Sequence, residues 1–132
     1  VRIFSDCLSP LLFDNADLAS ELSRVARHGR SCEVQILIKD SQFLVKRSHR
    51  LGALHQRLPS SVLLRKLEQH ADHYVANYVL VDDCGIFFIP NEDEKICFWN
   101  RDDRPLVKHY GEQFDELWQR SSADPEMRFM PM

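Results

Sequence analysis

Short apolar runs alternate with amphipathic helical stretches through the first half of the chain, and this alternation constrains the fold more than any other feature. Runs of strand length occur at residues 1–4, 34–38 and 62–64. Between them, residues 15–28 and 41–57 carry apolar side chains at helical spacing. The order strand, helix, strand, helix, strand is typical of an α/β domain.

Both helical stretches have recognisable ends. Asp14 or Asn15 can cap the first by accepting hydrogen bonds from its free amide groups, and Gly29 ends it. Pro59 ends the second. Leucine and valine side chains form the two apolar faces: Leu18, Leu22 and Val25, then Leu44, Leu51, Leu54 and Leu58.

The second half of the chain adds paired strands and the clearest helix. The longest extended region, residues 74–81, leads through a turn at 82–85 to an antiparallel return at 86–89. A further strand is expected at 96–99, and a helix with proline at its start at 105–121. We therefore predict an α/β fold with a mixed β-sheet and helices on both faces.

Length and composition fit one ordinary globular domain. The 132 residues are 44% hydrophobic and 28% charged, with a net charge of −3. We expect a single domain at residues 1–122 and a short C-terminal tail at 123–132. A net negative charge provides no strong field to hold nucleic acid or anionic lipid non-specifically.

Cysteine usage and hydropathy bear on the compartment. The four cysteines contain no CxxC pair, and Cys32, Cys84 and Cys97 lie in or beside apolar runs, so we expect buried thiols in a reducing compartment. No apolar stretch of membrane-spanning length and no leader is visible. We expect a cytoplasmic protein, and the start at Val1 suggests a piece of a longer chain.

The strand at residues 74–83, Tyr-Val-Ala-Asn-Tyr-Val-Leu-Val-Asp-Asp, resembles the signature strand of the phospholipase D superfamily. That family's motif is H-x-K-x-x-x-x-D, and the best register aligns Val75 with the histidine, Asn77 with the lysine and Asp82 with the aspartate. The preceding strand–helix alternation, the following hairpin and the last helix agree with half of such an enzyme. The resemblance implies a phospholipase D-like half of about 120 residues.

The same register implies that the chemistry of that family is lost. Valine has no lone pair to attack phosphorus, and asparagine has no charge to neutralise phosphoryl oxygens. Shifting the register by one residue gives Ala76 and Tyr78, which fail equally. Asp82 alone survives, and a hairpin turn favours an acid there in any case. We predict a non-enzymatic domain without a cofactor or metal.

The resemblance also implies partners. Family members with one motif pair as homodimers across the active-site edge, so we expect a homodimer with residues 75–77 and 99–101 at or beside the contact. We expect the domain to be an interaction or regulatory module of a longer bacterial protein. An acetyltransferase-type catalytic domain upstream of it is one such arrangement.

Two alternatives come from other residues. A nucleic-acid or phosphate-ligand binding domain could use the basic residues of the second helix, although an amphipathic helix normally presents such residues to water: Lys46, Arg47, His49, Arg50 and Arg57. An enzyme with rebuilt chemistry could use His70, His73 and Asp82, although no further ligands with zinc-site spacing follow the two histidines.

Three large aromatic side chains, Phe98, Trp99 and Trp118, are expected in the core. An exposed one would instead anchor an interface.

Overall fold

A computed structural model describes residues 1–5, 13–28, 32–39, 44, 49–67, 77–88 and 98–123. The elements in this part of the chain follow one another as β1 (Arg2–Ser5), α2 (Ala16–Arg27), β2 (Val34–Ile38), α4 (Arg50–Arg57), β3 (Val62–Lys66), β4 (Tyr78–Val81), β5 (Gly85–Phe88), β6 (Phe98–Asn100) and α5 (Arg104–Gln119).

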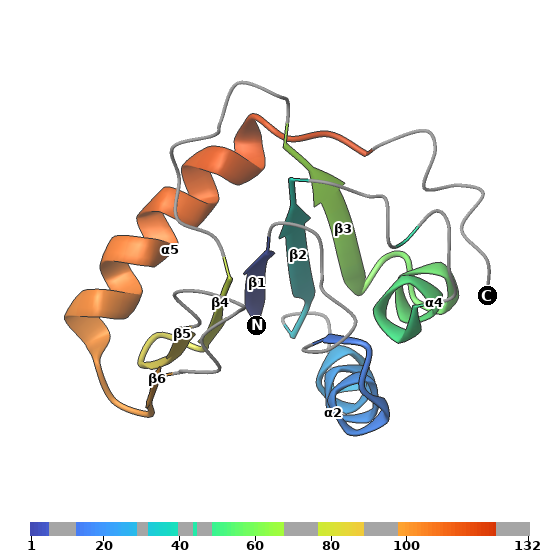
Figure 1. The fold of residues 1–132 in the computed structure, drawn as a ribbon, viewed down its shortest axis with the longest axis horizontal. Helices are drawn as coiled ribbons and strands as arrows, with labels where there is room; N and C mark the ends of the chain where they lie inside the picture. The colour runs from blue at the N-terminus through green and yellow to red at the C-terminus, as the bar shows by residue number, and fades with distance from the viewer. Residues whose placement is uncertain are drawn as a thin grey trace.

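The strands form one mixed sheet in the order β3-β2-β1-β4-β5-β6 (Figure 1). Strands β1, β2 and β3 are parallel, whereas β4 is antiparallel to β1, and β5 and β6 continue antiparallel. Parallel neighbours need crossover connections, which α2 and α4 supply, while β4 and β5 are joined by a tight turn. The predicted mixed sheet is confirmed.

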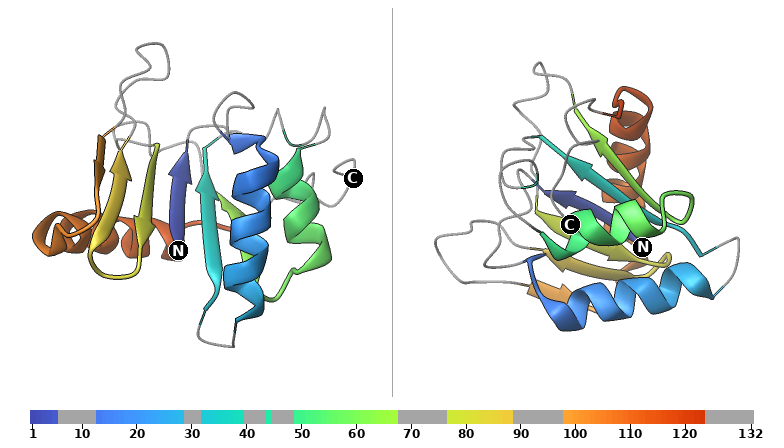
Figure 2. Two further views of the ribbon diagram at one scale, coloured as in Figure 1. Left: turned by 90° about the horizontal axis from the view of Figure 1, so that it is seen from below. Right: turned by 90° about the vertical axis from the view of Figure 1, so that its right-hand side faces the viewer.

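The helices cover both faces of the sheet. Helices α2 and α4 lie side by side over β2 and β3, and α5 crosses the opposite face (Figure 2), where its core includes Phe4 of β1 and Leu37 of β2 as well as residues of β4 and β5. Right-handed crossovers from β1 to β2 and from β2 to β3 place both connecting helices on one face. The prediction of helices on both faces is confirmed.

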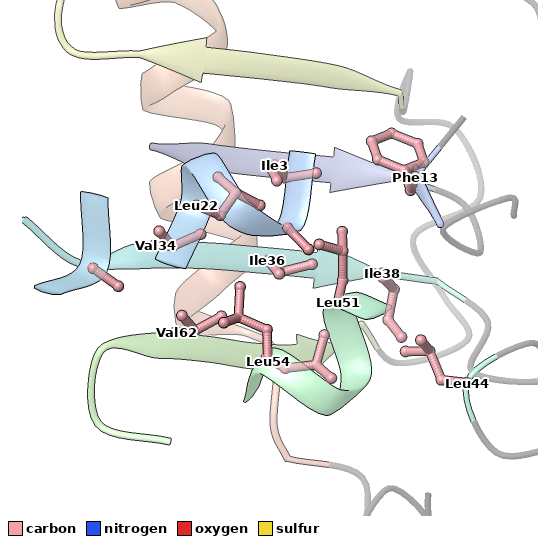
Figure 3. Close-up of a cluster of buried hydrophobic side chains, with 13 residues drawn as sticks. Ile3, Phe13, Leu22, Val34, Ile36, Ile38, Leu44, Leu51, Leu54 and Val62 are labelled. Atoms are coloured by element: carbon pink, nitrogen blue, oxygen red, sulfur yellow. The ribbon is translucent and has the colours of Figure 1, made fainter. Parts of the chain in front are cut away.

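The first core lies between the sheet and the pair α2 and α4 (Figure 3). Successive strand side chains point to opposite faces, so Ile3 of β1 and Ile36 of β2 face these helices. Leu22 of α2, with Leu51 and Leu54 of α4, packs on them, and all three are buried. The leucine stripes predicted from helical spacing are therefore the faces that bury.

The second core lies under α5. Phe4, Tyr78, Leu80 and Ile86 point to this face, where they meet side chains of α5 that include Phe114. The rings of Phe4 and Tyr78 meet edge to face with centroids 5.6 Å apart. Burial raises the pKa of the Tyr78 phenol, whose hydroxyl donates a 3.4 Å hydrogen bond to the Tyr110 carbonyl.

The expected single helix at 41–57 is wrong. His49 has extended backbone angles, φ −134° and ψ 131°, and α4 begins only at Arg50. The His49 ring nitrogen Nδ1 accepts a hydrogen bond from the Leu51 amide at 3.1 Å, so His49 caps α4. The other two helices begin at commoner caps, Asn15 for α2 and Asp103 for α5.

The expectation of buried cysteines is also wrong where it can be compared. Cys32 and Cys84 are thiols, but both are only half-buried. Cys97 lies outside the described residues. Over the described ranges, none of the helices is long and apolar enough to cross a membrane.

Candidate functional site

Asn77, aligned with the lysine of the resembled motif, holds two strands together. It precedes β4 with a left-handed φ of 73° and is only 5% exposed. Its backbone amide donates a hydrogen bond to the Phe4 carbonyl at 2.7 Å. Its side-chain Oδ1 accepts a 2.8 Å hydrogen bond from the Ser5 hydroxyl. Asparagine tolerates this backbone conformation better than most residues. Asn77 therefore joins the end of β1 to the start of β4.

Asp82 lies at the other end of β4, in the turn to β5. It is exposed and also left-handed, with φ 56°, where the chain reverses so that Val81 pairs with Gly85. The four residues of β4 separate it from Asn77, and five steps along an extended chain correspond to roughly 16 Å. The structure does not bring the two motif positions together. Val75, His70 and His73 lie outside the described residues.

The residues of the predicted basic surface have different environments. His49 is 3% exposed and caps α4, so its assignment to a binding surface is wrong. Arg50 is tied to Asp14, whose carboxylate accepts 3.1 Å hydrogen bonds from both the Arg50 amide and its guanidinium. Arg57 is exposed at the last turn of α4. Lys46 and Arg47 lie outside the described residues.

Helices α2 and α4 form the walls of a groove of about 730 Å³, called the arginine groove below. Among the described residues that line it, five are basic: Arg24, Arg27, His28, Arg50 and Arg57. The other described lining residues have small side chains: Ala16, Ala19, Ser20, Ser23 and Ala53. The arrangement can bind a negatively charged group in a site with little steric obstruction.

Sequence reasoning missed the α2 side of this groove. Arg24 and Arg27 are three residues apart and so share a helix face, which the spacing alone could have indicated. Their relation to Arg57 could be found only from the handedness of the two crossovers, which places α2 beside α4.

Two acidic residues neutralise part of the positive charge of the groove. Glu21 accepts two hydrogen bonds from the Arg24 guanidinium, at 3.0 and 3.1 Å, and both side chains are exposed. Partial burial acts to raise the pKa of Asp14, but hydrogen bonds from the Arg50 amide and guanidinium outweigh it and hold that pKa below its usual value. Asp14 is therefore ionised and neutralises Arg50.

A second surface, called the apolar row below, crosses strands β4 to β6. Val79, Phe87 and Trp99 are directly opposite one another in the register, on the face of the sheet that carries α2 and α4. Neither helix extends over β4 to β6 (Figure 2). Val79 and Phe87 are half-buried, Trp99 is 52% exposed, and its ring centroid lies 6.5 Å from that of Phe87.

Two of the three aromatic residues expected in the core are exposed. Phe98 and Trp99 lie on the edge strand β6, where their exposed fractions are 49% and 52%. Trp118 is half-buried, stacked on Phe114 at 5.7 Å and contacted by the Arg65 guanidinium at 4.7 Å from the ring centroid. The core assignment is wrong for the first two.

In the part of the chain that the structure covers, no three His, Cys, Asp or Glu side chains come together in a way that could hold a metal ion.

No curated protein and no solved structure matches this chain significantly. A family model does match, over residues 1–130, which is nearly the full length. The chain therefore belongs to the DUF7931 family, a domain of unknown function.

Proposed function

We propose that this domain is a non-catalytic interaction module with a phospholipase D-like arrangement, and that it associates with a second copy of itself through the end of the sheet formed by β4, β5 and β6. The observation that carries the proposal is the apolar row together with the exposed Phe98 on the same edge strand. The role of Asn77 supports the absence of catalysis.

The contacts of Asn77 support a structural role for this residue, which is aligned with the catalytic lysine of the resembled family. A group that stabilises a phosphoryl oxygen must face a ligand with its polar atoms available. The Oδ1 of Asn77 is instead engaged by the Ser5 hydroxyl, and the side chain is almost fully buried.

The apolar row supports self-association. An indole at the centre of a desolvated contact is among the side chains that contribute most to protein interfaces. The Trp99 ring reaches Gly85 of β5, where an added β-carbon would lie 3.2 Å from Cη2, and 52% of the side chain stays exposed. A two-fold contact would pack the row of one copy on that of the other, and two-fold dimers are the commonest homo-oligomers.

Light scattering on the purified chain tests the association. We expect a mass near twice 15.5 kDa at micromolar concentration and a monomer for Trp99→Lys, because a buried lysine at the contact lacks a partner. Leu63→Lys is the matched control, since Leu63 is a half-buried strand residue on β3. A wild-type monomer, or a dimer that persists in Trp99→Lys, would contradict the proposal.

A phosphodiester assay tests the absence of catalysis separately. We expect no turnover of a bis-aryl phosphodiester by the wild type or by Asn77→Lys, because the lysine would break the Ser5 hydrogen bond without completing a site. Turnover that disappears in Asp82→Asn would overturn this part of the proposal and leave the association intact.

A further inference from the structure

We infer that the arginine groove between α2 and α4 is a binding site for a small molecule that carries two or more phosphate groups. This inference is independent of the proposed self-association, because the groove is lined by α2 and α4, which lie over β2 and β3 (Figure 2), whereas the apolar row belongs to β4, β5 and β6.

The first argument is the placement of the arginines on two facing walls. Arg24 and Arg27 are one turn apart on α2, and Arg50 and Arg57 are two turns apart on α4. All four line the same groove. Guanidinium groups form paired, parallel hydrogen bonds with phosphate oxygens, so two walls of arginine can hold phosphates from both sides.

The second argument is charge that the protein itself leaves uncompensated. Arg24 is paired with Glu21 and Arg50 with Asp14. Within the described ranges, Arg27 and Arg57 make no ion pair, although both line the groove. The partial negative charge at the carboxyl ends of α2 and α4 offsets part of the charge of Arg27 and Arg57, and an anion that reaches both guanidinium groups would pair with the rest.

The third argument is the floor of the groove. The alanine and serine side chains that line it, among them Ala16, Ser20 and Ala53, are small and leave room for a ligand to enter between the arginines. The hydroxyls of Ser20 and Ser23 add donors suited to phosphate oxygens. A volume of about 730 Å³ is of the size that small-molecule ligands occupy.

The same observations favour a small phosphate ligand over a nucleic acid. No aromatic side chain is among the described residues that line the groove, so bases would find no stacking partner. The net charge of −3 gives little long-range attraction for a long polyanion. A compact ligand interacts electrostatically mainly with the arginines that line the groove.

Isothermal titration of the full chain with inorganic tripolyphosphate tests the inference. We expect saturable binding that Arg27→Ala with Arg57→Ala weakens about a hundredfold, since removing each charge-assisted hydrogen-bonding group reduces affinity by roughly tenfold. Arg120→Ala is the matched control, because Arg120 is exposed beyond α5 and away from the groove. Amide chemical shifts should change along α2 and α4 and not along β6.

Three outcomes would overturn the inference. They are no binding of tripolyphosphate, equal binding by the double variant, and tighter binding of a 20-base-pair DNA duplex or of a poly-glutamate peptide than of tripolyphosphate. Thermal melting of each variant separates lost binding from lost folding, because Arg27 and Arg57 are exposed and their removal should leave the melting temperature unchanged.

Discussion

The two halves of the sheet differ in what covers them on one face. Over β2 and β3, helices α2 and α4 bury the strand side chains and present arginines to solvent. Over β4 to β6 the same face carries Val79, Phe87 and Trp99 without a described helix above them. A covering helix converts an apolar sheet surface into a charged one, and where no described helix lies above the strands, apolar side chains stay partly exposed.

The two edges of the sheet differ in the same way. Beyond β3, the segment after α5 returns to the sheet, where Ser122 exchanges backbone hydrogen bonds with Lys66 at 2.9 and 3.2 Å. At the other edge, β6 carries Phe98 and Trp99, both about half exposed. No described strand pairs with the outer side of β6, and since an unpaired edge can bind another chain, the β6 side is where association is expected.

The largest expected effect is a difference in the free energy of unfolding between substitutions over β2 and β3 and substitutions in the apolar row of β4 to β6. Leu54→Ala, on the buried side of α4, should lower the free energy of unfolding by about 2–5 kcal/mol, because Leu54 is fully buried and a cavity remains. Val79→Ala should lower it by less than about 1.5 kcal/mol, because Val79 is half-buried. Urea denaturation measures both, and equal losses would show that the two halves are covered equally.

The next effect tests the junction between the halves. Ser5→Ala removes the hydrogen bond to Asn77 Oδ1 and should destabilise the fold by about 1–3 kcal/mol, because both residues are buried. Ser20→Ala, at an exposed position of α2, should change stability by less than about 0.5 kcal/mol. If the two variants denature alike, the β1–β4 junction is not held by this hydrogen bond.

A smaller effect concerns the start of the groove wall. Asn15 Oδ1 accepts hydrogen bonds from the Asp17 and Leu18 amides, so Asn15→Ala should destabilise the protein by about 1 kcal/mol. Asn15→Asp keeps the acceptor and should be nearly neutral. Circular dichroism melts compare them, and a similar loss in both variants would argue against capping as the cause.

The smallest effect is a pH dependence at the groove. The pKa of Asp14 is below its ordinary value of 3.8 in the folded protein, so its contribution to stability is present above pH 3.8 and is lost as the pH falls through the lower folded-state value. We expect about 1 kcal/mol or less, because Arg50 is largely exposed. Asp14→Asn should remove this part of the acid-induced loss, and an unchanged pH profile would contradict the prediction.

The sequence was sufficient for most elements, because periodicity reports local burial. The spacing of Leu18, Leu22 and Val25 indicates α2. The acidic turn with Gly85 indicates the hairpin. The prediction from sequence failed at His49, where α4 begins. Histidine is not among the common caps, and no proline or glycine interrupts the helical pattern between residue 41 and Arg50. Extended backbone at that position depends on contacts that local sequence does not encode.

For the candidate sites, the sequence identified residue types but not their surroundings. Arg57 was predicted from its own helix, whereas Arg27 joins it only because two crossovers place α2 beside α4. Phe98 and Trp99 have the composition of a buried strand, yet they are exposed because β6 is last in the strand order.

The sequence by itself determined most of the strands and helices, since side-chain periods of two and 3.6 residues record which face of each element is buried. The tertiary structure alone decided which face of the sheet each helix covers, which strand is left at the edge, and that Asn77 points inward to Ser5. These outcomes depend on strand order and crossover handedness, which bring together residues far apart in the chain.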